Sequence, residues 1–183
     1  MFEAYEQLIK ERLEPHRFQH SINVAEKSRE LARRFGADEN KAYLAGLLHD
    51  ICKNDSNEKM LQIFDAFGII LDNVQKRQQK LWHAVAGAAV IEHDLQIKDR
   101  ELIEAVRYHT TARANMTLLD KILYLADFVS ADRDFEGVQA LRDSVNAGLD
   151  EGLRACLKFS VLDLCNRDKQ IHPDTIDAYN QMV

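Results

Sequence analysis

Helical periodicity runs through almost all of this 183-residue chain, and no other sequence feature limits the fold as strongly. Apolar residues recur at spacings of three and four, and no convincing run of alternating β-branched residues interrupts them. Only 7 glycines and 2 prolines break the pattern, whereas a β-sandwich or barrel needs turn residues every few positions. We predict an all-α protein, a single compact bundle of about eight or nine helices.

Several of the expected helix ends carry recognisable capping residues. Pro15 should stop the first helix, and Gly36 is a natural residue after the end of the second. Ser56 can cap a helix start, and Thr117 with Asp120 three residues later resembles a capping box. The helices are expected at about 2–14, 17–35, 38–53, 57–66, 74–94, 99–109, 117–130, 136–147 and 149–167.

The charge balance and the targeting signals limit the classes of binding partner and the cellular compartment that we expect. The chain has 24 basic and 30 acidic residues, and its basic residues are scattered. Proteins that grip DNA or RNA carry a basic stripe, so a nucleic-acid polymer is disfavoured, whereas a small phosphorylated ligand is compatible. No apolar stretch approaches the roughly 20 residues of a membrane span, and no signal-peptide pattern begins the chain. Three cysteines, an odd number, suit a reducing compartment, so we expect a cytoplasmic protein with no membrane contact.

Four histidines and two aspartates stand in apolar helical surroundings. A lone histidine on an apolar stripe is more often a hydrogen-bonded core residue, and a buried carboxylate is costly unless it is paired or binds a metal. Six such residues on several buried faces of a small domain are most easily satisfied together, by converging on a metal. Imidazole and carboxylate ligands suit Fe, Mn, Zn or Co. The six residues are His20, His49, Asp50, His83, His109 and Asp127.

The order of four of these residues resembles a known signature. His20, the adjacent pair His49-Asp50, and then Asp127 resemble the H…HD…D pattern of the HD-domain metal-dependent phosphohydrolases. The surrounding strings RFQHSINVA (17–25), AGLLHDICK (45–53) and YHTTARANM (108–116) are similar to the bacterial YqeK-type family of symmetrical diadenosine tetraphosphate hydrolases. The likeness runs from about residue 14 to the C-terminal 172–180 segment.

Three positions depart from that family's usual pattern. Ser130-Ala131 stands where Glu-Pro is usual, Glu136 replaces a proline, and Ala84 replaces a glycine. None of them is a presumed metal ligand. The first two place the shape of the loop around Arg133, and with it the details of nucleotide binding, in question.

The resemblance implies a single HD domain over residues 1–183, with a metal-binding core at about 16–135 and C-terminal helices at 136–183 packed on it. It implies hydrolysis of diadenosine tetraphosphate at the centre of its polyphosphate, giving two ADP. Iron is the metal implied, mononuclear or dinuclear, with Mn, Co and Zn as alternatives. His20, His49, Asp50 and Asp127 would ligate the first metal. His83 and His109 would hold a second metal bridged by Asp50, or would contact the phosphates.

The expected chemistry is attack by hydroxide, because a metal with open coordination positions lowers the pKa of bound water. The residues expected at the catalytic step are Asp50, Lys53, His83 and His109. Substrate contacts are expected from Arg17, Lys53, Thr110, Thr111, Asn115, Arg133 and His172. Some of these have structural alternatives: Lys53 could be a solvated lysine at a helix end, and the threonines and Asn115 could terminate and cap helices.

Two other functions stay open at this stage. Fold and metal ligands do not fix the substrate, so an HD-domain nucleotidase that releases phosphate from a mononucleotide is an alternative. A nucleotide-sensing module without activity is disfavoured, because such a module tolerates loss of ligands and all six are present here. The expected partner is a small dinucleoside polyphosphate, with an ADP or GDP-like product. A homodimer is compatible with a small helical domain.

Overall fold

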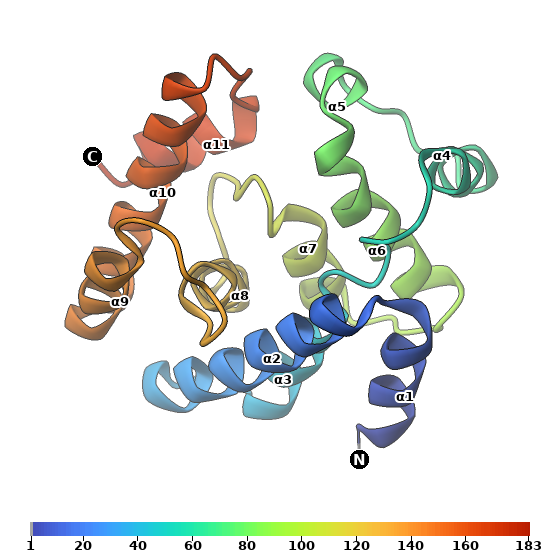
Figure 1. The fold of residues 1–183 in the computed structure, drawn as a ribbon, viewed down its shortest axis with the longest axis horizontal. Helices are drawn as coiled ribbons and strands as arrows, with labels where there is room; N and C mark the ends of the chain where they lie inside the picture. Colours follow the sequence, from blue (N-terminus) through green and yellow to red (C-terminus); the bar gives the residue numbers. More distant parts are fainter. Residues whose placement is uncertain (1) are drawn as a thin grey trace.

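The computed structural model describes residues 2–183 and confirms the all-α fold class. Figure 1 shows that the described residues form helices without a strand. Within them there are more helices than the eight or nine expected. The helices are α1 (Glu3–Arg12), α2 (Pro15–Phe35), α3 (Glu39–Leu48), α4 (Asn57–Ala66), α5 (Asn73–Arg77), α6 (Trp82–His93), α7 (Arg100–Tyr108), α8 (Leu118–Val129), α9 (Val138–Ala147), α10 (Leu149–Asn166) and α11 (Pro173–Asn180), with a 3₁₀ turn η1 (Gln79–Leu81) before α6.

The predicted capping residues begin and end helices as expected. The Ser56 side chain accepts a hydrogen bond from the backbone of Lys59 and starts α4. Thr117 and Asp120 form a reciprocal capping box at the start of α8. Gly36 follows α2 with φ +80°, a left-handed conformation that glycine adopts without steric cost. These ends depend on bonds between near neighbours, which is why the sequence predicts them.

The expected helix at 74–94 was wrong as one element, because the chain forms α5, η1 and α6 there. Asp72 and Gln75 make a capping box that starts α5, and Gln78 leaves the helical region at φ −119°, ψ 80°. The indole N–H of Trp82 then donates to the carbonyl oxygen of Gln75 at 2.7 Å. This tertiary bond satisfies a helix-end carbonyl and stabilises the break.

Two more boundaries differ from the prediction. The helix expected to reach Lys53 ends at Leu48, and bonds between residues three apart take over, including Lys53 N–H to Asp50 C=O at 2.8 Å. The last helix expected from periodicity ends at about residue 167, but the segment after it contains α11, which has Pro173 in its first turn. A proline there is compatible with a helix, because its missing N–H would have no partner at that position.

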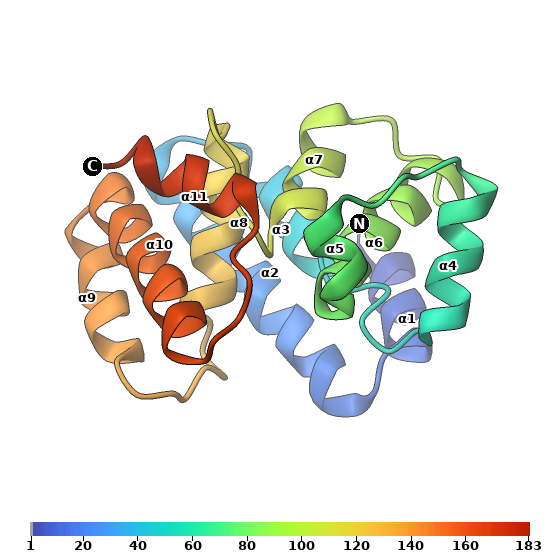
Figure 2. The same cartoon turned by 90° about the horizontal axis from the view of Figure 1, so that it is seen from above.

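The arrangement of the helices leaves four of them in the middle. Figure 2 shows α9, α10 and α11 at one end of the molecule and α1, α4, α5 and α6 at the other, with α2, α3, α7 and α8 between them. The close approach of α2 and α3 requires a glycine. A Cβ atom on Gly46 would lie 2.7 Å from the backbone Cα of Ala25. Every helix of residues 2–183 is too short or too polar to cross a bilayer.

The loop between α8 and α9 is held by one arginine. The guanidinium of Arg142 donates to the carbonyl oxygens of Ser130 at 2.9 Å and Arg133 at 2.8 Å. It also donates to the carbonyl of Val129 at 3.3 Å. Ser130 is fully buried. The loop shape is therefore defined by hydrogen bonds from Arg142 to backbone carbonyls, with Ser130-Ala131 in place of a Glu-Pro sequence.

Candidate metal centre

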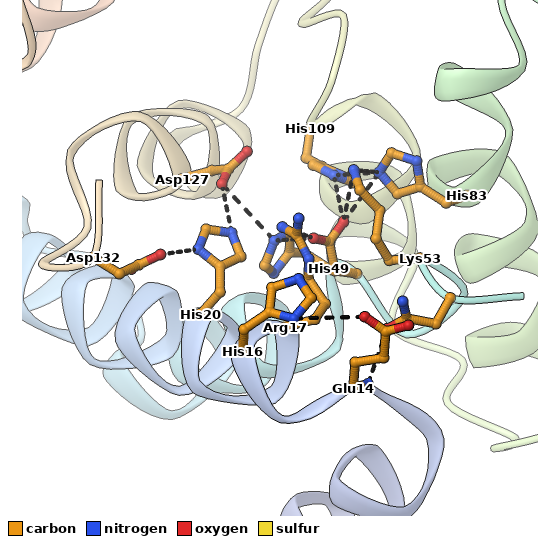
Figure 3. Close-up of polar contacts among 12 residues, drawn as sticks. Glu14, His16, Arg17, His20, His49, Lys53, His83, His109, Asp127 and Asp132 are labelled. Atoms are coloured by element: carbon orange, nitrogen blue, oxygen red, sulfur yellow. Dashed lines mark hydrogen bonds and ion pairs between the residues drawn. The ribbon is translucent and has the colours of Figure 1, made fainter. Parts of the chain in front are cut away.

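The six residues singled out in the sequence meet in one cluster among α2, α3, α6, α7 and α8. Figure 3 shows His20, His49, His83, His109 and Asp127 pointing toward one another from these elements. Five of the six are almost fully buried, and the side chain of Asp127 is 19% exposed. Three overlapping groups of three have ligand atoms within 4.8 Å of one another, and together they contain all six residues.

At one end of the cluster, His20 lies between two carboxylates. Its Nε2 is 3.0 Å from Oδ1 of Asp127, and its Nδ1 is 2.7 Å from Oδ2 of Asp132. The other oxygen of Asp132 accepts a hydrogen bond from the amide of Asn23 at 3.0 Å. A carboxylate behind the ring fixes its orientation and raises its basicity, as in many metal sites.

Asp50 joins this end to the other, because its two oxygens face different partners. Its Oδ2 lies 3.4 Å from Nε2 of His49 and accepts a hydrogen bond from Arg17 at 3.0 Å. Its Oδ1 lies 3.0 Å from Nε2 of His83 and 3.6 Å from Nε2 of His109. This is the geometry expected of a carboxylate that bridges two cations.

His49 and His109 are held in the same way by the ends of their helices. His49 follows α3 and its Nδ1 lies 2.7 Å from the carbonyl oxygen of Gly46. His109 follows α7 and its Nδ1 lies 2.7 Å from the carbonyl oxygen of Val106. A carbonyl only accepts, so each Nδ1 carries a proton, and each Nε2 is turned toward the cluster. Helix geometry thus sets both tautomers.

Two atoms of the cluster lack a well-aligned hydrogen bond within the described residues. His49 Nε2 and Asp50 Oδ1 are buried and form no well-aligned hydrogen bond. Nearby, Nε2 of His83 and Nε2 of His109 lie 3.3 Å apart. Buried polar atoms are almost always satisfied, and facing lone pairs repel unless a proton or cation lies between them. Nitrogen and oxygen donors of this kind fit a divalent metal.

The protonation states also suit metal binding. Burial lowers the pKa of His83 to about 4, so its ring is neutral near pH 7. Burial opposes ionisation of Asp50, but the neighbouring histidines, His49 first, outweigh it and hold its pKa well below the usual value. Burial likewise opposes ionisation of Asp127, but His20 and Arg133 hold the pKa of that carboxyl well below the usual range. Neutral imidazoles and ionised carboxylates are the forms that ligate metals.

Three of the predicted substrate-binding residues contact the cluster, and each is a cation. Arg17 bonds Asp50, as described above. Lys53 Nζ lies 3.1 Å from Nε2 of His83 and 3.6 Å from Oδ1 of Asp50. Arg133 pairs with the carboxylate of Asp127 and donates from Nε to its backbone oxygen at 2.6 Å. Their side chains are between one fifth and one third exposed, so they lie at the boundary between cluster and solvent.

The other predicted substrate contacts have different partners. Thr110 is half-buried and directly follows His109, whereas the buried Thr111 hydroxyl donates to the carbonyl of Ala112 at 2.9 Å. Asn115 forms hydrogen bonds with Gln181. His172 caps α11 and places its Nε2 2.6 Å from a carboxylate oxygen of Asp72. Asn115 and His172 therefore join segments that are far apart in the sequence.

Asp132 and Asn23 are the cluster's supporting residues that sequence reasoning missed. Asn23 follows His20 by three positions and therefore lies on the same face of α2, which is a usable signal. Asp132 lies in the loop after α8, where no periodicity indicates the direction of a side chain. Its place beside Arg133 is the only hint that the sequence offers.

Comparisons with known proteins agree with this geometry. The family model described as "HD domain" matches residues 17–132, a segment that contains the whole cluster. A relative from Bacillus subtilis named "Bis(5'-nucleosyl)-tetraphosphatase, symmetrical" is 35% identical over 96% of this chain and 94% of its own length. A relative of the same name from Staphylococcus aureus is 37% identical over 97% and 92%.

A solved structure is similar over the full fold. It is a crystal structure of a predicted HD superfamily hydrolase involved in NAD metabolism from Clostridium acetobutylicum, with a TM-score of 0.94 and 30% identity, covering 100% of this chain and 96% of that one. The resemblance found in the sequence motifs is thereby confirmed. The chain belongs to the HD-domain family and, within it, groups with the symmetrical bis(5'-nucleosyl)-tetraphosphatases.

Proposed function

We propose that this protein hydrolyses diadenosine tetraphosphate at the centre of its polyphosphate and releases two ADP. The observation that carries the proposal is the buried cluster in which His49 Nε2 and Asp50 Oδ1 form no well-aligned hydrogen bond with any of residues 2–183. Relatives that match nearly the whole chain bear the name of this activity, which supports the choice of substrate.

The metal would be divalent, with iron as our first choice and Mn, Co and Zn as alternatives. His20, His49, Asp50 and Asp127 would hold one ion. His83 and His109 would hold a second, with Asp50 shared between the two ions, or would contact phosphate. When bound, such an ion lowers the pKa of coordinated water and offsets negative charge on phosphate oxygens.

The surrounding cations would bind and orient the polyphosphate. Lys53 is placed beside His83 and Asp50, so its ammonium can contact a phosphate at that end of the cluster. Arg133 is held on Asp127 at the other end, and its planar guanidinium suits a bidentate phosphate contact. Arg17 bonds Asp50 and can orient that carboxylate between the two ends.

We keep Thr110, Thr111, Asn115 and His172 as predicted substrate contacts, with Thr110 first because it adjoins His109. We also propose that the chain is one domain, since α9 and α10 pack on α8, which carries Asp127. A cytoplasmic location suits the three free cysteines Cys52, Cys156 and Cys165.

Product analysis in isotopically labelled water tests the reaction. The protein is loaded anaerobically with ferrous iron and given diadenosine tetraphosphate in H₂¹⁸O, and the products are separated by ion exchange. Central attack predicts ADP as the only nucleotide product, with one ¹⁸O atom for every two ADP molecules. ATP plus AMP would contradict symmetrical cleavage. Release of phosphate from a mononucleotide panel, with no dinucleotide turnover, would establish the alternative nucleotidase.

A further inference from the structure

A cleft begins at the metal centre and leads away from it. It has a volume of about 780 Å³, and both Asp127 and Arg133 lie in its wall. From there it extends between α8, the loop after α8, and α10. Its size falls in the range of about 300–1,000 Å³ that small-molecule sites occupy. Of the residues expected from the sequence to contact substrate, only Arg133 lines this cleft.

Three phenylalanines give the cleft its chemical character. Phe128, Phe135 and Phe159 all line it, and each is half-buried. The ring centroids of Phe135 and Phe159 are 5.2 Å apart and those of Phe128 and Phe159 are 6.2 Å apart. Polar groups of α10 complete the wall, including Asn166 near the end of that helix. An aromatic surface beside a phosphate-binding cation suits a nucleotide, because every nucleobase has a face that can stack.

The opposite end of the cluster opens into a cleft of different chemistry. It has a volume of about 470 Å³ and includes Lys53 and His83. The other residues that line it are Asp55, Asn57, Met60, Gln79 and Lys80, with no phenylalanine, tyrosine or tryptophan. The two halves of a symmetrical substrate would therefore meet unequal surroundings.

We propose that the aromatic cleft binds the nucleobase and ribose of one ADP half of the substrate, with stacking on Phe135 and Phe159. The assignment rests on the proposed function and adds the site that distinguishes a nucleotide from a bare polyphosphate. In this arrangement the phosphates of that half lie at Asp127 and Arg133, and the second half extends toward Lys53 without an aromatic platform.

Binding of ADP and of pyrophosphate to the metal-loaded protein separates base contacts from phosphate contacts. Both ligands are titrated calorimetrically into the wild type and into Phe135→Leu and Phe159→Leu, which keep apolar bulk but remove the ring. We expect each variant to bind ADP about tenfold more weakly, from lost stacking, and to bind pyrophosphate as the wild type does. Phe67→Leu is the matched control, because Phe67 is also half-buried but lines a separate cleft on α6 and α7.

Each other outcome overturns the assignment. Unchanged ADP affinity in both ring variants would place the base elsewhere. Equal losses for ADP and pyrophosphate would mean that the rings act on the phosphate site. Thermal unfolding of each variant identifies loss of fold, and if Phe159→Leu is unstable, Phe135→Leu on the loop still decides the question. Turnover of diadenosine tetraphosphate by the wild type is measured separately, so failure of the proposed function and failure of the base site give different results.

Discussion

The two ends of the metal cluster are built on different principles. At the α2–α8 end, His20 is held from behind by Asp132, which Asn23 holds in turn. At the α6–α7 end, Nε2 of His83 lies 3.3 Å from Nε2 of His109 and 3.1 Å from the Lys53 ammonium. The first end is oriented by hydrogen bonds before any ion arrives. The second gathers nitrogens that repel one another until a proton or cation is shared between them.

This difference predicts unequal affinities for two ions. Each end carries a cation, Arg133 on Asp127 and Lys53 beside His83. The difference is that His20 has a carboxylate behind its ring, which orients the ring and raises its basicity. We therefore expect the α2–α8 end to hold metal more tightly. Asp50 is the one residue that belongs to both ends.

The largest effect should come from removing Asp50. We expect Asp50→Ala to lower kcat by roughly 10³-fold, about 4 kcal/mol of transition-state stabilisation, because it removes a ligand from both ends. Helix content by circular dichroism should stay close to that of the wild type. Elemental analysis should show little bound metal. A variant with full metal content and full turnover would refute the shared role of Asp50.

Substitutions at single ends should separate the two metal positions. We expect His83→Ala to lower metal content from about two ions to one and kcat by about 10²-fold, since the α2–α8 ligands remain. We expect His20→Ala to remove the tighter ion, which appears as loss of the high-affinity phase in a metal titration. If both variants lost metal to the same degree, the cluster would be a single site.

The support behind His20 should have a smaller effect. Asp132→Ala removes the carboxylate that orients the ring, and loss of such a partner typically weakens metal binding by about 10- to 100-fold. Asp134→Ala is the matched control, because Asp134 lies in the same loop and is exposed. Metal affinity from a competing chelator is the measurement. Equal affinities in the two variants would remove Asp132 from the site.

The smallest effect should come from Lys53. We expect Lys53→Met to lower kcat/KM by about tenfold, the loss of one charge-assisted contact of about 1.5 kcal/mol. Lys10→Met, an exposed lysine on α1, should leave turnover unchanged. If Lys53 only offsets the negative charge of Asp50 at the α6–α7 end, the Lys53→Met variant should instead bind metal more tightly and have a normal KM.

The sequence predicts those parts of this molecule that depend on near neighbours or on burial. The capping box of Thr117 and Asp120 lies within one turn, so its residues suffice to find it. The six cluster residues could be identified because an ionisable side chain on an apolar helix face is costly to bury unless it has a partner. The fold class follows from periodicity alone.

The parts that escaped prediction depend on tertiary contacts. The break between α5 and α6 is stabilised by Trp82 bonding a carbonyl seven residues earlier, which no periodicity reveals. The direction of Asp132 is set by a loop that Arg142 holds. The aromatic cleft joins Phe128 and Phe135 to Phe159 on a later helix, so its existence depends on how α10 packs.

The wide spacing of the proposed metal ligands along the chain has a further consequence for the unfolded state. His20 and Asp127 are 107 positions apart, so an ion held by both ties off more than half of the polypeptide as a closed loop. The three cysteines are free, and no disulfide restricts the chain in this way. A covalent link around a loop of that size can lower the entropy of the unfolded chain by the equivalent of about 4–5 kcal/mol. A bound ion would thus act as a reversible cross-link that stabilises the folded state. The supply of metal in the cell would then affect the rate at which the protein unfolds.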